Sequence, residues 1–274
     1  MNQFLDFVRA HGLITDHIII GRWVRVPTEN HPKKKNGAYK FMGDHGFVQD
    51  HATQTEVSLW RPDVKSEIRI DHAAIAAIAE RQAQERRQAQ AKAANRAKEI
   101  VAASRIGLHP YLKDKGFPDE RGLIYTQDDG DKLVVPMSVQ GRLCGCQLIG
   151  EDAGKKFLYG QATNDATFVI GSGPAILCEG YATALSIRAA LRMPRSIVAC
   201  FSAHNLKRVA QSHRDALVVA DNDESGTGQG VAVETGLPYW LSDKVGEDFN
   251  DFATRVGSFR ASQALKLALM KKRA

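Results

Sequence analysis

The chain has 274 residues, of which 43% are hydrophobic and 25% are charged, and its formal net charge at pH 7 is +6. These values are those of a soluble globular protein that can fold one or two domains around a real core. They argue against a membrane-spanning protein, because no apolar run reaches the roughly 18 residues that a transmembrane helix needs. No signal peptide opens the sequence, so we expect a cytoplasmic protein without a membrane partner.

The positive charge predicts a polyanionic partner, because contacts to phosphate come mainly from Lys and Arg. Charge alone leaves open a mildly basic protein without such a partner. The cysteines lie in apolar, strand-like segments and form no Cys-x-x-Cys pair. This pattern predicts buried free thiols in a reducing compartment, with neither a zinc ribbon nor bound zinc. The four are Cys144, Cys146, Cys178 and Cys200.

Residues 1–70 are predicted to form a small, basic, β-rich unit. An amphipathic helix is expected over residues 2–12, with Gly12 as its stop. Short apolar runs predict strands over 18–20, 23–26, 38–41, 46–49 and 57–60.

A basic loop in this unit is a candidate contact for nucleic acid. Such a loop beside aromatic rings can hold a phosphate backbone while the rings stack on bases. The alternative is a solvated turn over an aromatic core. The residues concerned are Lys33, Lys34, Lys35, Trp23, Tyr39 and Trp60.

A long helix is predicted next, within a linker over residues 71–104. The segment 72–104 is rich in Ala and contains neither Pro nor Gly, and Asp71 is a candidate N-cap. At 1.5 Å per residue the helix would span about 50 Å. Because its middle has almost no large apolar side chain, we expect a largely exposed spacer. DNA binding along its basic residues is the alternative to a solvated face.

Residues 105–170 are predicted to form a second β-rich segment, with strands over 123–125, 133–135 and 143–149. A further short strand brings in Lys155 and Lys156. Residues 150–156 superficially suggest a phosphate-binding loop. That loop is one residue too short, and Phe157 stands where a hydroxyl is needed, so no helicase motor is predicted.

Residues 171–257 show the alternation of a parallel α/β sheet with flanking helices. Apolar runs over 175–178, 196–200 and 217–220 are separated by helical segments over 182–191 and from 206, and a weak strand follows over 238–241. Ligands bind beyond the carboxyl ends of such strands, which places Glu179, Asp221 and Asp223 at one edge. Three carboxylates repel each other, so their grouping favours a divalent cation, Mg²⁺ or Mn²⁺.

These residues resemble a Toprim domain, the metal-binding fold shared by DnaG-type primases, topoisomerases and some nucleases. The motifs are Glu-Gly-Tyr at 179–181 and Asp-x-Asp-x-x-Gly ending at Gly226. The wider pattern resembles primases of phages and mobile elements over residues 106–257. Its segments are Leu-Val-Val-Pro-Met at 133–137, Gly-Arg at 141–142, Lys-Lys-Phe-Leu at 155–158 and Glu-Asp-Phe-Asn-Asp at 247–251. The implied fold class is α/β within an overall α+β chain.

The resemblance implies roles for particular residues. Asp221 and Asp223 would be catalytic metal ligands. Glu179 would be a catalytic metal ligand or the general base for the hydroxyl, and Asp248 would be a further ligand or would support the ligands from behind. Asp251 would replace a charge that primases carry where this chain has Asn250. Lys156 would be a catalytic lysine facing the active site. Gly180 and Gly226 would allow close backbone approach. The residues expected to contact nucleotide or DNA are Arg142, Lys155, Lys156 and Asn205, with Lys33, Lys34 and Lys35.

The leading hypothesis is a DNA primase that makes short RNA primers on single-stranded DNA from nucleoside triphosphates, with a separate replicative helicase as partner. A metal-dependent nuclease on the same Toprim site is one alternative. A non-catalytic, DNA-binding replication accessory is another. Residues 258–274 are expected to form a basic amphipathic helix after the Toprim-like region.

Overall fold

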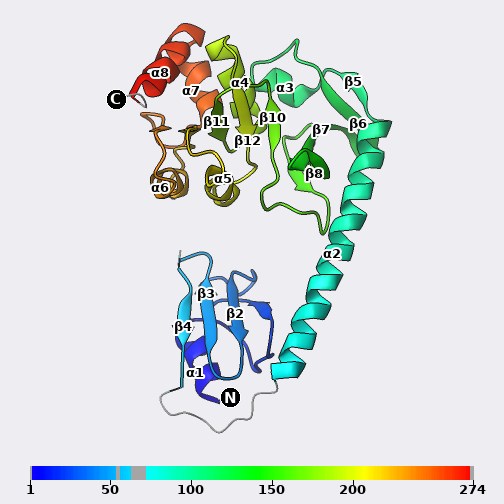
Figure 1. Ribbon diagram of the computed structural model, residues 1–274, viewed down its shortest axis with the longest axis vertical. Coiled ribbons are helices and arrows are strands. Elements are labelled where there is room, and N and C mark those ends of the chain that lie inside the picture. Colours follow the sequence, from blue (N-terminus) through cyan, green and yellow to red (C-terminus); the bar gives the residue numbers. More distant parts are fainter. Residues whose placement is uncertain (1, 54–55, 63–71, 272–274) are drawn as a thin grey trace. The chain divides into compact units, whose positions relative to one another are not determined.

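The computed structural model describes residues 2–53, 56–62 and 72–271. The chain divides into two compact units, Met1–Arg87 and Gln88–Ala274. The long helix α2 (His72–Ala103) begins in the first unit and ends in the second (Figure 1). None of the described helices combines the length and the apolar character needed to cross a membrane.

The first unit packs one helix on an antiparallel four-stranded sheet of order β1-β2-β3-β4. Phe4 of the helix is fully buried and stacks on Phe41, with 4.7 Å between ring centroids. A Cβ at Gly46 would lie 2.2 Å from the Phe4 ring, so the packing requires glycine there. The expected strand over 18–20 is wrong, because Ile20 makes only an isolated bridge to Phe41. The elements are α1 (Asn2–Ala10), β1 (Trp23–Val26), β2 (Gly37–Phe41), β3 (Gly46–Asp50) and β4 (Ser58–Trp60).

Helix α2 confirms the predicted long helix, and Asp71, its proposed N-cap, lies outside the described residues. The described side chains before position 93 are mostly exposed, as expected of a spacer. The last three turns differ, because Ala97 and Ile100 are buried against Val134 and Cys146 of the following sheet. The end of α2 is therefore part of a hydrophobic core.

An antiparallel sheet of order β5-β6-β7-β8-β9 follows. One face packs against α2, and the other presents Leu133, Val135 and Ile149 to helix α4 (Tyr181–Leu191), which packs on the C-terminal sheet. The three-residue strand β5 was not predicted. The elements are β5 (Arg105–Gly107), α3 (Pro110–Asp114), β6 (Gly122–Gln127), β7 (Gly130–Val139), β8 (Arg142–Ile149) and β9 (Lys155–Phe157).

The C-terminal sheet has the order β10-β12-β11-β13-β14, with β10 antiparallel at one edge and the other strands parallel. Helices α4, α7 and α8 cover one face, and α5 and α6 cover the other (Figure 1). This confirms the predicted parallel sheet with flanking helices. The strands are β10 (Phe168–Ile170), β11 (Ala175–Cys178), β12 (Ser196–Ala199), β13 (Leu217–Val219) and β14 (Tyr239–Trp240). The helices are α4 (Tyr181–Leu191), α5 (Ala203–Ala210), α6 (Thr227–Glu234), α7 (Phe249–Val256) and α8 (Ser258–Lys271).

Candidate metal centre

The register of two parallel strands brings the first two carboxylates to one edge of the sheet. Cys178 of β11 lies opposite Val219 of β13, so Glu179 and Asp221 leave their strands at nearly the same level. Both strands are apolar and buried because helices cover both faces of the sheet. The chain can therefore turn polar only where the strands end, and this places the acids beyond their carboxyl ends.

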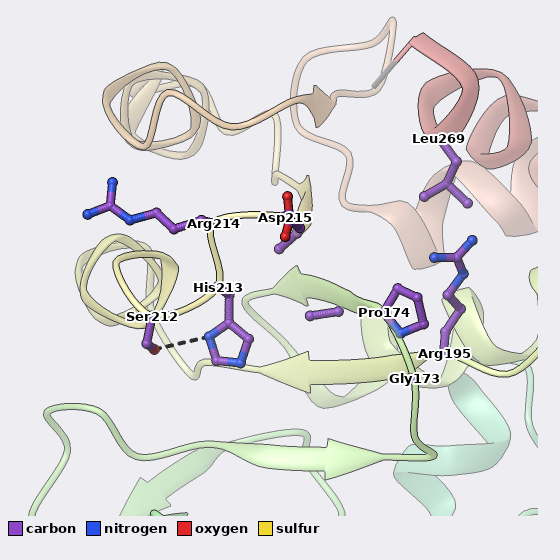
Figure 2. Close-up of a pocket in the computed structure, with 10 residues that line it drawn as sticks. Gly173, Pro174, Arg195, Ser212, His213, Arg214, Asp215 and Leu269 are labelled. Carbon is purple, nitrogen blue, oxygen red and sulfur yellow. Dashed lines mark hydrogen bonds between the residues drawn. The ribbon is translucent and has the colours of Figure 1, made fainter. Parts of the chain in front are cut away.

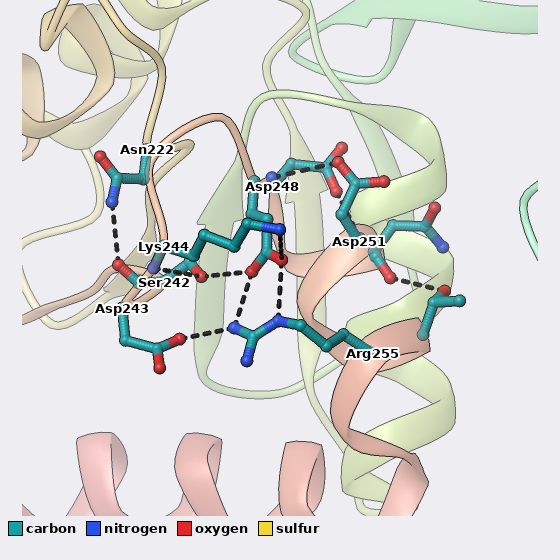
Figure 3. A network of polar contacts seen from close by, with 10 residues as sticks. Asn222, Ser242, Asp243, Lys244, Asp248, Asp251 and Arg255 are labelled. Carbon is teal, nitrogen blue, oxygen red and sulfur yellow. Dashed lines mark hydrogen bonds and ion pairs between the residues drawn. The ribbon is translucent and has the colours of Figure 1, made fainter.

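A polar network brings the third segment, residues 242–248, to the same edge (Figure 3). The backbone N–H of Asn222 donates to the Glu247 carbonyl at 3.1 Å, and its side-chain amide donates to the Ser242 carbonyl at 3.0 Å. Glu247 is buried, and Arg255 donates to both of its carboxylate oxygens at 2.8 Å. Because Asn222 follows Asp221 and Glu247 precedes Asp248, the network brings these two aspartates together. Sequence reasoning missed the contributions of Asn222 and Arg255.

Asp221 has the most perturbed carboxylate in this group. Its Oδ1 atom is buried without a hydrogen-bond partner. Burial, followed by the charges of Glu179, Asp248 and Asp223, raises the pKa of Asp221 to about 8, against a smaller opposing effect of Lys155. Burial and Asp223 also raise the pKa of Glu179. The negative charges therefore lie close enough to destabilise one another.

Asp223 has a second role at the start of α6. Its Oδ1 accepts from the Ser225 hydroxyl at 2.6 Å and the Thr227 N–H at 3.1 Å, and its Oδ2 accepts from the Gly228 N–H at 3.3 Å. Burial alone would raise its pKa, but these hydrogen bonds lower it. The close backbone approach expected at Gly226 is found at Gly228, where a Cβ would lie 2.1 Å from the Asp221 carbonyl oxygen.

Asp248 and Asp251 form a capping box at the start of α7. The Asp251 N–H donates to Asp248 Oδ1 at 2.8 Å, and the Thr183 hydroxyl donates to Asp248 Oδ2 at 3.3 Å. Asp251 pairs with Lys115 at 3.8 Å and is not among the charges that perturb Asp221. Asn250 is buried, and its amide donates to Ser186 Oγ at 2.9 Å. Asp251 is thus the N3 residue of this capping box, and its role as a replacement ligand stays a prediction.

The donor set fits a hard divalent cation. Carboxylate oxygens suit Mg²⁺ or Mn²⁺, and a cation beside the unpartnered Oδ1 of Asp221 would offset the repulsion from Glu179 and Asp248. Among the described residues, no three His, Cys, Asp or Glu side chains already form a metal-binding cluster. Mg²⁺ is usually held by one or two carboxylates together with waters and substrate phosphates, so it does not need a closed protein cage.

The family model for the Toprim domain matches residues 174–258, the segment that carries these acids. The chain contains a Toprim domain. Its parallel strands and helices are those described above, and all five candidate metal ligands fall inside the matched residues.

Similarity to known proteins extends beyond the Toprim domain. The chain is 28% identical over 236 residues to the DNA primase TraC of Escherichia coli; the match covers 77% of this chain and 22% of TraC. The chain thus spans about a fifth of the length of that relative.

Solved structures show a more distant likeness. A chain in a bacteriophage T7 assembly of lagging-strand DNA polymerase with primase domains is 16% identical. The match covers 61% of this chain and 92% of that one, with a TM-score of 0.44. A DNA primase domain from Pseudomonas aeruginosa is 14% identical, with 58% and 57% covered and a TM-score of 0.37.

Of the two neighbouring lysines on β9, Lys155 is the one whose charge acts on Asp221, whereas the predicted catalytic lysine was Lys156. Lys155 pairs with Ile149, whose side chain faces the Toprim domain, and Lys156 pairs with Leu148, whose side chain faces α2. Directly paired residues share a face of a sheet, so the two lysines point to opposite sides. The influence of Lys155 on Asp221 agrees with this assignment.

Two other predicted contacts are not at the Toprim acids. Asn205 is buried, and its amide donates at 2.8 Å to the carbonyls of Ala166 and Cys200, so these donors are already used inside the protein. Arg142 begins β8, whereas Lys155 pairs with the last residue of that strand. At about 3.3 Å per residue, these positions are about 23 Å apart along the strand.

The basic loop of the first unit lacks the aromatic neighbours that were expected. Lys33, Lys34 and Lys35 are exposed between β1 and β2. Tyr39 is buried and Trp60 packs on Phe4, so both rings belong to the core. Trp23 pairs with Lys40 at the far end of the β1–β2 ladder from this loop. The solvated turn over an aromatic core describes this arrangement.

A cavity of about 630 Å³ lies at the amino ends of the parallel strands of the Toprim sheet, opposite to the acids (Figure 2). Its lining includes Ala175, the first residue of β11, and Ala216, which precedes β13. Arg195 and Arg214 also line it, and neither makes a hydrogen bond or ion pair within the described part of the chain. The acids stand beyond the other ends of these strands, so this cavity is not part of the candidate metal centre.

Proposed function

We propose that this chain is a DNA primase that joins ribonucleotides into short primers on single-stranded DNA. The observation that carries the proposal is the buried, unpartnered oxygen of Asp221 among Glu179 and Asp248, inside a Toprim domain. The similarity to TraC supports the choice of primer synthesis over the other reactions of this domain family. The proposed compartment is the cytoplasm, and a separate replicative helicase is the proposed partner.

The proposed roles follow from the charges at the site. Glu179, Asp221 and Asp248 would hold Mg²⁺ or Mn²⁺, with Asp223 contributing while it caps α6. Such an ion orients phosphate oxygens and stabilises the leaving pyrophosphate. Lys155 would neutralise a phosphate of the triphosphate or the template, because its ammonium group is the cation whose charge reaches Asp221.

Primer synthesis from labelled ribonucleotides on a single-stranded template tests the proposal. Wild-type protein with Mg²⁺ or Mn²⁺ should produce new oligomers, and Asp221→Asn should reduce synthesis by at least about 100-fold, because it removes a metal ligand. Asp221→Asn should stay folded and gain thermal stability in metal-free buffer at neutral pH, because the raised pKa of Asp221 means that ionisation of this carboxyl opposes folding. Glu179→Gln should behave similarly in the synthesis assay.

Lys156→Ala provides a matched control, because Lys156 neighbours Lys155 but faces the other side of the sheet. It should retain far more synthesis than Lys155→Ala. Wild-type-level synthesis by Asp221→Asn would contradict the assignment of the site. Template cleavage without new oligomers would identify a nuclease, and DNA binding alone would identify an accessory protein.

A further inference from the structure

Phe201 has a backbone conformation that bulky residues rarely adopt. Its φ is +66°, in the left-handed region, two residues after the end of strand β12. Such a conformation costs free energy in a residue with a Cβ, and it persists only where the surrounding structure enforces it. Strain of this kind is concentrated at functional sites, so the direction in which the side chain points is informative.

The strained backbone is held from both sides. The Phe201 N–H donates to the carbonyl oxygen of Glu179, the candidate metal ligand, at 2.7 Å. The next residue, Ser202, is the N-cap of α5, and its hydroxyl accepts from the Asn205 N–H at 3.2 Å. The Phe201 ring is therefore fixed beside the acidic edge of the Toprim domain.

The ring of Phe201 meets an exposed aromatic side chain from the other sheet. Its centroid lies 6.2 Å from that of Phe157, with an interplanar angle of 81°. Phe157 belongs to β9 and is 44% exposed, although it is large and apolar. The contact joins residues far apart in the sequence, and it leaves aromatic surface open to solvent.

A cation stands on the same strand face as this aromatic pair. Lys155 is two residues before Phe157 on β9, so both side chains project to one side. The ammonium group of Lys155 lies 5.8 Å from the centroid of the Tyr111 ring. The neighbourhood thus combines an apolar aromatic surface, a positive charge and the nearby carboxylates. This combination matches a nucleotide, which presents a flat base and charged phosphates.

We propose that Phe201 and Phe157 form a stacking site for one nucleobase of a ligand whose phosphate contacts Lys155. The inference rests on the proposed function for the identity of that ligand, a nucleoside triphosphate or single-stranded nucleic acid. Every base has an aromatic face, so the site would tolerate any base sequence.

Binding of two matched oligonucleotides tests the stacking site. One is a short, labelled oligo(dT), and the other is an abasic strand with the same number of phosphates. Wild-type protein should bind oligo(dT) about tenfold more tightly than the abasic strand, and Phe157→Leu or Phe201→Leu should remove most of this preference. Phe259→Leu is the control, because Phe259 is 80% exposed on α8 and should leave the preference unchanged. Equal weakening of both ligands, or no weakening, would exclude single-stranded nucleic acid as the ligand, and together with no quenching by ATP in the Phe157→Trp variant below it would overturn the proposal.

Phe201→Gly separates the role of the ring from that of the strained backbone. Glycine adopts a φ of +66° readily, so relief of strain should offset part of the lost packing and keep the protein folded. The variant should melt within a few degrees of wild type and lose the base preference as Phe201→Leu does. A folded Phe201→Gly protein with undiminished base preference would overturn the proposal.

A fluorescent substitution distinguishes the two ligand sources. In Phe157→Trp the new indole should be quenched when a base stacks on it, either by ATP or by oligo(dT), and quenching by neither would overturn the inference. If wild-type protein makes no primers but retains the base preference, the proposed function fails and the stacking site stands. If wild-type protein makes primers but neither the base preference nor quenching by ATP is found, the stacking site alone fails.

Discussion

Asp221 is the residue where folding and ligand binding make opposite demands. Folding buries its carboxylate beside Glu179 and Asp248 and leaves Oδ1 without a partner, which destabilises the charged form. Ligand binding needs this same unpartnered oxygen to attract a cation. Nothing else in the described part of the chain offers Oδ1 a hydrogen bond, which leaves this oxygen available to a cation.

The cysteines give a prediction at the same scale with a defined pH dependence. Burial raises the pKa of Cys146 to about 11 and raises the pKa values of Cys178 and Cys200, so the unreactive thiol form dominates at pH 8. Cys144 is only partly buried. An aromatic disulfide reagent at pH 8 should therefore label Cys144 first in native protein, and all four cysteines after denaturation.

The labelling rate of Cys144 should rise with pH, because burial also raises the pKa of this thiol above the ordinary value. While the pH is below that pKa, each increase of one pH unit raises the thiolate fraction about tenfold. Cys144→Ser should remove the fast phase. Rapid labelling of Cys178 in the native protein would contradict the buried position found for it.

The residue types in the sequence predicted where the acidic side chains lie, but they did not predict which way other side chains point. Glu179 and Asp221 could be predicted because a buried parallel strand can change to polar sequence only at its end. The orientation of Lys155 depends on its pairing with Ile149, which residue type does not reveal. Asn205 lies at the correct edge, but its amide is used by the carbonyls of Ala166 and Cys200.

At the scale of elements, the long helix was predictable, whereas the short strands β5 and β10 were not. Helix α2 has 32 residues without Pro or Gly, so its sequence pattern is unambiguous. Strands β5 and β10 have three residues each, too few for a period to appear, and both depend on pairing with a neighbour. Helix α7 begins inside the acidic motif, where the polar residues that suggest a ligand site also serve as its caps.

The segment before α7 gives the prediction at this scale. Arg255 ties Glu247 and Asp243 together, with its closest contact to Asp243 at 2.6 Å (Figure 3). Arg255→Met should leave buried Glu247 with only its longer ion pair to Lys244, at 3.7 Å. It should lower the melting temperature by several degrees and weaken stabilisation by Mg²⁺, because Asp248 would be held less firmly. Differential scanning fluorimetry with and without Mg²⁺ measures both effects.

Arg260→Met is the matched control for this network, since Arg260 is exposed and makes no hydrogen bond or ion pair in the described part of the chain. It should melt as wild type does. Unchanged stability of Arg255→Met would mean that the network does not position Asp248.

At the scale of the whole molecule, each compact unit has a hydrophobic core of its own. We expect calorimetry to resolve two unfolding transitions. Gly46→Ala should lower only one of them, because its Cβ would collide with Phe4 in the first unit. Mg²⁺ should raise only the other, which contains the Toprim acids. A single transition that shifts with both changes would contradict this division.

The β8–β9 pairing has a consequence for how such a chain can change over generations. Since adjacent residues of a strand face opposite ways, gaining or losing one residue between positions 150 and 154 would exchange the two neighbouring amines. The composition and the total charge of the chain would barely change, yet the lysine that faces the acids would then be Lys156 in place of Lys155. Selection on this hairpin should therefore act on the length of its loop as strongly as on its amino-acid sequence.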